Sequence, residues 1–422
     1  MESLKEILEL LNPWWKEGQI TKELARPYKR KLFNKLFKLV SYKQIIIISG
    51  LRRIGKTTLI YQLIEHLLKK SDPKMLLYFS FDKEVDGIIE ILNAYNEITG
   101  INWEKSHLFV FLDEVTKLHG WANKIKLVYD AFPNLKFIIS SSGSTLLEQE
   151  AIKALAGRYF LINLKPLSFI EFLELKNKSE YIANQGLWEK EIKRELNLYL
   201  IRTFPEIIEW KDELLIKDYL RTTIIDKIIK MDIQEKFRNI NRDLLFDLMK
   251  IFYSEPGMIL DYDGLSKKLR VSKKTLSSHI FYLEFSYLIK RIKNYRINVL
   301  SASKKLQKIY GYWWNLVYCY PHNSDKLIEN IVANTLDVQY YWRKNGKEID
   351  FIFINKKKLI PVEIKNKNEI RKSDIQTLKY FLAKYKLKEG YIIYLGEEDE
   401  MKFNQQRIKL IPLWKFLLKP II

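Results

Sequence analysis

Short apolar runs alternate with helix-length segments over the first part of the chain. The runs cover residues 45–48, 75–79, 108–112 and 135–139. Each intervening segment is long enough for a crossover helix, which is the pattern of a parallel α/β sheet. The sequence therefore predicts a parallel-sheet α/β core over residues 44–165, with a helical segment over residues 1–43 before it.

The pattern changes twice after this core. Residues 166–241 place apolar side chains at helical spacing, which predicts an all-helical lid. Residues 242–310 predict a helix–turn–helix followed by two strands, the pattern of a winged helix, with the strands at 287–290 and 296–299. A second α/β domain is predicted over 311–422, with strands at 338–342, 349–354, 359–365 and 391–394 and helices near Ile328 and Leu378.

A glycine-rich loop follows the first apolar run directly. Gly50-Leu51-Arg52-Arg53-Ile54-Gly55-Lys56-Thr57 satisfies G-x-x-x-x-G-K-[ST], and an amphipathic stretch follows from Thr58 to Leu68. Backbone N–H groups and the positive end of that helix can hold the phosphates of ATP. We predict that Lys56 reaches phosphate oxygens and that Thr57 binds Mg²⁺. The predicted cofactor-binding residues of the loop are Gly50, Arg53, Gly55, Lys56, Thr57 and Thr58.

Two carboxylates end the third apolar run. Asp113 is predicted to hold Mg²⁺, and Glu114 to orient or deprotonate the attacking water. A buried strand that ends in an acidic helix cap is the alternative. The fourth run leads into Ser140-Ser141-Ser142-Gly143-Ser144, where Ser142 is predicted as a sensor beside the γ-phosphate. A serine turn that caps a helix explains that stretch as well.

Several motifs together resemble a known family. They are Asn12-Pro13-Trp14-Trp15, the phosphate loop with Thr58, Leu112-Asp113-Glu114-Val115 with Gly120-Trp121, and Leu155-Ala156-Gly157-Arg158-Tyr159 running into Pro166-Leu167-Ser168-Phe169. These resemble the archaeal AAA-type ATPases over nearly the whole chain, although Thr203-Phe204-Pro205-Glu206 departs from the Gly-Gly-Phe-Pro turn of such relatives. The resemblance implies an ATPase core, a winged helix and a C-terminal nuclease-like domain. It also implies that Arg158 contacts a γ-phosphate, in its own subunit or a neighbour's; a plain helix-end arginine is the alternative.

Charge points to a nucleic-acid partner. The chain has 72 Lys and Arg against 51 Asp and Glu, and residues 265–310 alone hold 12 basic residues and one acid. Ser272 can cap a helix that buries Leu276, Ile280 and Leu283 and turns its first residues outward, as a recognition helix does. The predicted DNA contacts are Lys273, Lys274, Ser277, Arg291 and Lys293. A solvated basic face, or a winged helix that serves as an interdomain adaptor, is the alternative.

A carboxylate–lysine pattern lies in the last domain. Asp350, Glu363 and Lys365 have the D-(x)n-E-x-K form of the PD-(D/E)xK nucleases. Strand period puts Glu363 and Lys365 on one face, and Asp350 on the neighbouring strand can converge with Glu363 on Mg²⁺ or Mn²⁺. We predict these three as catalytic, with Glu329 as an added metal ligand; Gln376 occupies a region where several relatives use a glutamine. An inactive nuclease-like fold, or a surface salt bridge between Glu363 and Lys365, is the alternative.

Composition excludes other classes. No apolar run approaches the ~20 residues of a membrane span, and the one cysteine, Cys319, permits no internal disulfide, which fits the cytosol. The sequence thus predicts a cytoplasmic, ATP-dependent enzyme that processes duplex or branched DNA, with a homo-oligomer allowed. The rivals are a nucleotide-gated DNA-binding switch whose nuclease-like domain is inactive, and an adaptor-type ATPase whose winged helix contacts protein.

Overall fold

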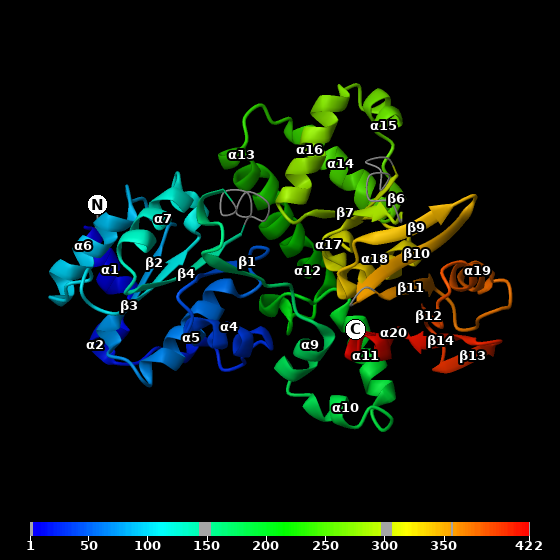
Figure 1. Cartoon of the computed structure of the whole chain (residues 1–422), viewed down its shortest axis with the longest axis horizontal. Helices are drawn as coiled ribbons and strands as arrows, with labels where there is room; N and C mark the ends of the chain where they lie inside the picture. Colours follow the sequence, from blue (N-terminus) through cyan, green and yellow to red (C-terminus); the bar gives the residue numbers. More distant parts are fainter. Residues whose placement is uncertain (1–2, 143–152, 297–305, 356–357, 422) are drawn as a thin grey trace. The chain divides into compact units, whose positions relative to one another are not determined.

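The computed structural model describes residues 3–142, 153–296, 306–355 and 358–421, and the chain divides into two units, residues 1–166 and 167–422. The first unit is a five-stranded parallel sheet in the order β2-β3-β4-β1-β5 with helices around it (Figure 1). This confirms the predicted parallel α/β core. Its elements are α1 (Leu4–Leu11), α2 (Trp14–Glu17), α3 (Lys22–Ala25), α4 (Leu32–Val40), β1 (Ile45–Ser49), α5 (Lys56–Leu68), β2 (Leu76–Ser80), α6 (Ile88–Thr99), β3 (Leu108–Asp113), α7 (Trp121–Ala131), β4 (Leu135–Ser141) and β5 (Tyr159–Asn163).

The strands carry polar residues at their carboxyl ends. Strands β1 and β2 are buried along their whole length, as expected for a parallel sheet covered on both faces. The apolar runs end one or two residues before β1, β3 and β4 do, and the added residues are Ser49, Asp113, Ser140 and Ser141. Because β1, β3 and β4 are neighbours, these polar residues meet at one edge of the sheet, directly beside the phosphate loop.

The Asn-Pro-Trp-Trp motif closes the outer edge of the sheet. Strand β2 is an edge strand, and its backbone groups would otherwise be open to pairing with another chain. Asn12 exchanges hydrogen bonds with the backbone of Tyr78, and the indole N–H groups of Trp14 and Trp15 both donate to the carbonyl of Leu76 at 2.9 Å. The motif therefore stabilises the edge of the core.

A buried lysine joins the end of α4 and the segment after it to strand β4. The Lys136 ammonium, on β4, donates to the carbonyls of Leu39, Tyr42 and Gln44, which lie between the end of α4 and the start of β1. Burial lowers the pKa of Lys136 to about 8.

Lys136→Met should therefore destabilise the first unit. The substitution leaves these carbonyls without their donor, which costs about 2–4 kcal/mol of unfolding free energy. The urea midpoint of the full chain measures the loss. The control Lys105→Met, at an exposed position, should change stability by less than about 0.5 kcal/mol. Equal urea midpoints for the two variants would contradict a stabilising role for Lys136.

The second unit begins with helices. As predicted, every described element from 167 to 236 is helical, including two π-helical stretches at Leu220–Asp226 and Ile228–Asp232. The α-helices there are α9 (Phe169–Leu175), α10 (Ser179–Ala183), α11 (Glu189–Tyr199), α12 (Glu213–Tyr219) and α13 (Ile233–Lys236). Their role as a lid stays a prediction.

One mixed sheet of nine strands forms the rest of this unit, in the order β13-β14-β12-β11-β10-β9-β7-β8-β6 (Figure 1). Its strands are β6 (Met258–Ile259), β7 (Ile289–Asn294), β8 (Gln307–Gly311), β9 (Tyr340–Lys344), β10 (Lys347–Asn355), β11 (Lys358–Lys365), β12 (Glu389–Tyr394), β13 (Asp399–Phe403) and β14 (Gln406–Pro412). Its helices are α14 (Arg242–Ser254), α15 (Tyr262–Lys268), α16 (Lys273–Phe285), α17 (Trp314–Val317), α18 (Ser324–Leu336), α19 (Gln376–Lys384) and α20 (Leu413–Leu418).

The sheet crosses the domain boundary drawn from the sequence at residue 310. Strand β7 pairs antiparallel with β8 and parallel with β9, so the strands after α16 and the C-terminal strands share one ladder. Of the second strand predicted at 296–299, Arg296 follows the end of β7 and residues 297–299 lie outside the described residues, so that strand stays a prediction; the described strand that pairs antiparallel with β7 is β8. Among the described residues, no helix combines the length and apolar composition that a membrane crossing requires.

Candidate functional site

The phosphate loop joins β1 to α5 and needs glycine at both ends. Gly50 has a φ of 154°, and a Cβ there would lie 2.2 Å from the carbonyl oxygen of Leu164. Gly55, at the N-cap of α5, has a φ of 96°. Between them Arg53 adopts a left-handed φ of 60°, a conformation uncommon for a residue with a side chain. The loop thus has the tight backbone that a phosphate cradle needs, at the start of a helix.

Lys56 is buried over this loop. Its ammonium donates to the carbonyls of Gly50 at 3.1 Å and Leu51 at 3.0 Å, and it lies 3.7 Å from Oε1 of Glu114. Thr57 and Thr58 follow on the first turn of α5. The structure therefore brings the loop lysine and the predicted water-activating carboxylate together, as the sequence predicted.

Asp113 ends β3 at the centre of a hydrogen-bond cluster. Its Oδ2 accepts from the Thr57 hydroxyl at 2.6 Å and from the Tyr78 hydroxyl at 3.1 Å, and its Oδ1 accepts from the Ser140 hydroxyl. Burial, and then the charge of Glu114, raise the pKa of Asp113. A hydroxyl and a carboxylate this close are oxygen donors of the kind Mg²⁺ takes, so Thr57 and Asp113 would hold the predicted metal, which would supply positive charge to the phosphates.

Glu114 is held in a strained turn. It has a left-handed φ of 51°, and its Oε2 accepts from the backbone N–H of Ser142 at 3.1 Å and from the Ser142 hydroxyl at 2.9 Å. Burial disfavours its charged form, but Lys56 and Ser142 outweigh burial and lower its pKa. A carboxylate kept ionised in this way can accept a proton or a hydrogen bond from water.

Two predictions for this unit fared differently. Ser142 lies at the site, on Glu114, although Gly143 and Ser144 of the same stretch lie outside the described residues. Arg158 lies away from the phosphate loop, before the first residue of β5 and therefore at the amino edge of the sheet, where it pairs with Asp130 at 2.8 Å. Arg158 therefore does not lie beside the phosphate loop of its own chain, and a role at a neighbour's nucleotide stays a prediction.

Sequence reasoning missed Tyr78, on β2. Its hydroxyl reaches Asp113, and its ring packs against Tyr61 of α5 at 5.0 Å between centroids. Burial, followed by the charge of Asp113, raises its pKa, so it stays a hydrogen-bond donor. Its position two residues before Ser80, which pairs with Asp113 across the ladder, is the one signal that could have placed it on the same face.

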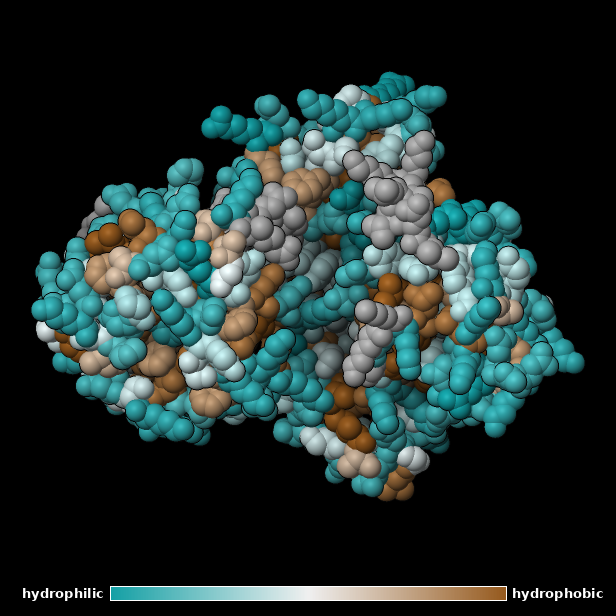
Figure 2. Space-filling view, in the orientation of Figure 1, coloured by the Kyte–Doolittle hydropathy of each residue, from teal (hydrophilic) through white to brown (hydrophobic). Residues whose placement is uncertain are grey.

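Helix α16 has the predicted cap and buried stripe. The Ser272 hydroxyl accepts from the Thr275 backbone N–H at 3.0 Å, and the predicted stripe residues Leu276, Ile280 and Leu283 are buried. Lys273, Lys274, Ser277 and Lys293 are exposed, and Lys273 pairs with Asp263. The surface over α15 and the start of α16 is largely hydrophilic (Figure 2).

Two basic residues of this segment do not belong to its outer surface. Arg291, predicted as a DNA contact, is half-buried and pairs with Glu284 of α16, which fixes β7 to that helix. Lys308 points into the second unit, with 3% of its side chain exposed, and pairs with Glu348 at 2.5 Å. The charge available to a polyanion is therefore smaller than the composition implies.

Asp350 and Glu363 lie at the next position of the ladder between β10 and β11. Phe351 pairs with Val362 in the antiparallel ladder of β10 and β11, so the next pair along is Asp350 with Glu363. The register of β10 against β9 shifts between Ile349 and Ile352, and both of these isoleucines lie in one core cluster. Bulges of this kind redirect a side chain and are frequent beside functional sites.

Asp350, Glu363 and Lys365 interact electrostatically. Burial, and then the charge of Asp350, raise the pKa of Glu363 well above its ordinary value. Burial disfavours the charge on Lys365, but Glu363 and Asp350 outweigh it and raise the pKa of that lysine, whose ammonium donates to Glu363 at 3.2 Å. Asp350 accepts from the backbone N–H of Ile364 at 2.8 Å. The half-buried Asp350 and the buried Glu363 together offer the carboxylate oxygens that a divalent cation prefers.

Glu329 does not complete the predicted ligand set. Its oxygens accept from the Tyr310 hydroxyl at 3.0 Å and from the Lys326 ammonium at 2.6 Å. Within residues 3–142, 153–296, 306–355 and 358–421, no three His, Cys, Asp or Glu side chains are grouped as metal ligands. Gln376 is exposed and donates to the Lys372 carbonyl at 2.7 Å. Tyr310 and Lys326 already bond the oxygens of Glu329, and its role as a metal ligand stays a prediction.

Sequence analysis also did not predict two buried asparagines that join helix α18 to strand β8. Asn330 and Asn334, on α18, both bond the backbone of Gly311, and they bond each other at 2.7 Å. Their i, i+4 spacing on a buried helix face was the available signal.

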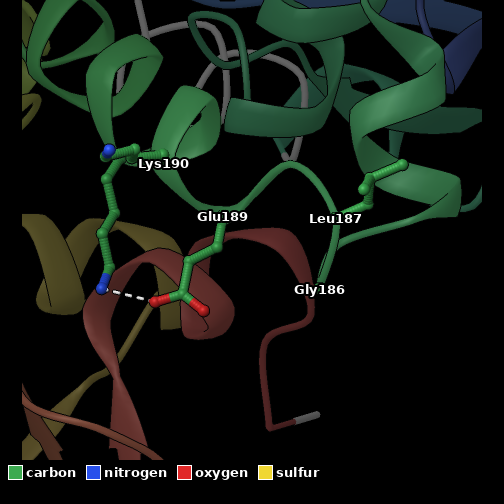
Figure 3. A pocket seen from close by; sticks show the side chains of 5 residues that line it. Gly186, Leu187, Glu189 and Lys190 are labelled. Atoms are coloured by element: carbon green, nitrogen blue, oxygen red, sulfur yellow. Dashed lines mark ion pairs between the residues drawn. The ribbon is translucent and has the colours of Figure 1, made fainter.

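A shallow pocket lies at the α10–α11 connection, lined by Gly186, Leu187, Glu189, Lys190 and Lys193 (Figure 3). Lys193 pairs with Glu189 at 2.5 Å and with Glu397 at 3.4 Å. None of the residues that line this pocket was predicted as a site residue.

Comparisons with known proteins match parts of both units. Residues 42–173 match the model of the AAA domain family, and residues 193–312 and 325–416 match two families described as domains of unknown function, DUF8612 and DUF4143. Two uncharacterized proteins of Methanocaldococcus jannaschii are 27% identical over 94% of this chain and 93% of their own length, and 28% identical over 89% and 85%. A Walker-type ATPase of Pyrococcus abyssi is 15% identical in structure-based alignment, with a TM-score of 0.42 over 72% of this chain and 99% of its own.

The class of fold is thus a P-loop ATPase-like α/β core followed by a further mixed-sheet unit. The match to the AAA domain model covers residues 42–173, which contain most of this core.

Proposed function

We propose that this chain binds ATP with Mg²⁺ and hydrolyses it. The observation that carries the proposal is the convergence of Lys56, Thr57, Asp113 and Glu114 at one edge of the parallel sheet. Lys56 binds phosphate oxygens, Thr57 and Asp113 hold the metal, and Glu114 orients the attacking water. The match of residues 42–173 to the AAA domain supports it.

Nucleotide binding by the purified full chain tests this proposal. Wild-type protein should bind a fluorescent ATP analogue in the presence of Mg²⁺ and release phosphate from ATP. Lys56→Ala should lose binding, because the ammonium is the loop's buried cation. An unchanged affinity in Lys56→Ala would place the nucleotide elsewhere.

We propose that residues 242–311 form a DNA-binding winged helix. The support is the element order α14-β6-α15-α16-β7-β8, with α16 capped by Ser272 and its first turn exposed. Lys274, Ser277 and Lys293 provide the outer contacts, while Arg291 holds β7 against α16.

DNA affinity should fall steeply with salt. Each neutralised phosphate adds about −0.9 to the slope of log affinity against log salt on duplex DNA, so replacing Lys274 and Lys293 together by Ala should flatten that slope by ~1–2. Fluorescence anisotropy with a labelled duplex measures it. The control Lys69→Ala with Lys70→Ala removes two exposed lysines from the first unit and should leave the slope unchanged. A slope near zero in the parent protein contradicts the proposal.

A second candidate activity rests on the carboxylate pair. We propose that Asp350 and Glu363 hold Mg²⁺ or Mn²⁺ and that Lys365 stabilises the scissile phosphate of a nucleic acid, as in a PD-(D/E)xK nuclease. The observation that favours it is the placement of Asp350 beside the buried Glu363 on the neighbouring strands β10 and β11. A nucleotide-gated switch that binds DNA without cutting it is the rival, and plasmid nicking in the presence of either metal separates the two.

A further inference from the structure

The structure joins two basic, tyrosine-rich segments that lie far apart in the sequence. Residues 340–347 and 376–388 together contain seven Lys or Arg and no Asp or Glu. The first forms β9 and the turn into β10, and the second forms α19 and the chain after it. The Lys347 ammonium lies 3.7 Å from the ring centroid of Tyr380, and the rings of Trp342 and Tyr380 lie 6.3 Å apart, so the segments make one surface.

Aromatic rings are the centre of this surface. Leu378, Phe381 and Leu382 bury the inner side of α19, which turns Tyr380 outward with 40% of the residue exposed. Tyr385 and Trp342 lie beside it, joined by a hydrogen bond of 3.0 Å from the indole N–H to the tyrosine hydroxyl. Lys384 lies over the rings of both Trp342 and Tyr380.

Lysines surround these rings. The exposed ones are Lys344, Lys347, Lys384, Lys386 and Lys388. None of these five forms an ion pair with another described residue, whereas the nearby Arg343 lies 3.7 Å from Glu348. The surface therefore carries cations open to a polyanion, placed around an exposed ring.

We propose that this surface binds single-stranded nucleic acid, with an unpaired base stacked on Tyr380 and the backbone phosphates held by Lys347 and Lys384. Stacking platforms flanked by cations are how proteins hold single strands, because every base offers a π-face and every phosphate a charge. A duplex keeps its bases stacked inside and would use only the lysines. Lys347, which covers the ring, can exchange that contact for a phosphate when a base arrives. The proposal does not depend on the carboxylate pair being active.

Binding of labelled oligothymidylate, oligouridylate and a duplex to the full chain tests this. Tyr380→Ala should weaken single-strand binding about tenfold, the change expected for loss of one modest base–aromatic stack, and duplex binding less than about twofold. Tyr380→Phe should keep the affinity, since it keeps the ring. Tyr42→Ala, which removes another exposed tyrosine in the first unit, should change neither. The two oligonucleotides report whether the surface prefers DNA or RNA.

The contribution of Lys347 and Lys384 is measured separately, by the salt dependence of single-strand binding. Lys347→Ala with Lys384→Ala should flatten the salt slope for the single strand by ~1, at about −0.7 per phosphate, while Lys69→Ala with Lys70→Ala leaves it unchanged. Loss of duplex and single-strand affinity to the same degree in Tyr380→Ala would overturn the proposal. So would absence of single-strand binding by folded wild-type protein, or binding only to vesicles of anionic lipid.

Discussion

Glu114→Gln should bind ATP as tightly as the wild type and hydrolyse it ~10²–10⁴ times more slowly. The amide keeps the size and accepts the two hydrogen bonds from Ser142, so the local structure survives. What it loses is the negative charge that Lys56 and Ser142 stabilise, and with it the ability to take a proton from water. Separate measurements of nucleotide affinity and of phosphate release under single turnover check the unchanged affinity and the slower hydrolysis.

Two controls sharpen this test. Glu104→Gln neutralises an exposed glutamate of the same unit and should leave turnover unchanged. Ser142→Ala removes one of the two donors on Oε2 of Glu114, and turnover should fall less than in Glu114→Gln, because the backbone N–H remains. Unchanged hydrolysis in Glu114→Gln would assign the water-activating role to another group.

The first unit could be predicted from sequence because its signals are local. The apolar runs, Gly50, Gly55 and Asp113 all lie where a strand, a tight turn or a strand end requires them. Strand β5 was missed although Tyr159-Phe160-Leu161-Ile162 is an apolar run as long as that of β1, and only one of its residues is buried. Arg158 was predicted at a phosphate from the motif around it. Its position before β5 places it at the edge opposite the phosphate loop, and only the strand order reveals that.

The second unit was harder because its features depend on long-range pairing. Lys308 looked like one more basic residue of the predicted DNA surface. Because β8 lies beside β7 inside the nine-stranded sheet, its ammonium is buried near three carboxylates, and Asp350, Glu329 and Glu348 together raise its pKa against burial. The shift in register between β10 and β9 beside Asp350 has no local sequence signal either. The pairing of Asp350 with Glu363 was nevertheless predicted, because strand period and the short turn between β10 and β11 fix their register.

Asp350→Asn and Lys365→Ala should each lower metal-dependent cleavage by ~10²–10³, and the double variant should lose little more. Asn keeps an acceptor for the Ile364 N–H but removes one of the two facing charges, so the cation site fails while the strand pairing holds. Lys365→Ala leaves both carboxylates and removes the cation beside the phosphate. Groups that act on one reacting centre give losses that do not multiply.

Nicked and linear plasmid, quantified against time with Mg²⁺ or Mn²⁺, measures this. ATP hydrolysis should persist in all three variants, because the phosphate loop belongs to the first unit. Lys367→Ala is the matched control for Lys365→Ala: its ammonium pairs with Asp374 instead of Glu363, and cleavage should stay within about threefold of the wild type. If wild-type protein cuts no nucleic acid with either metal, or Asp350→Asn cuts as well as the wild type, the carboxylate pair is not a nuclease site, and the nucleotide-gated DNA-binding switch becomes the better account of this chain.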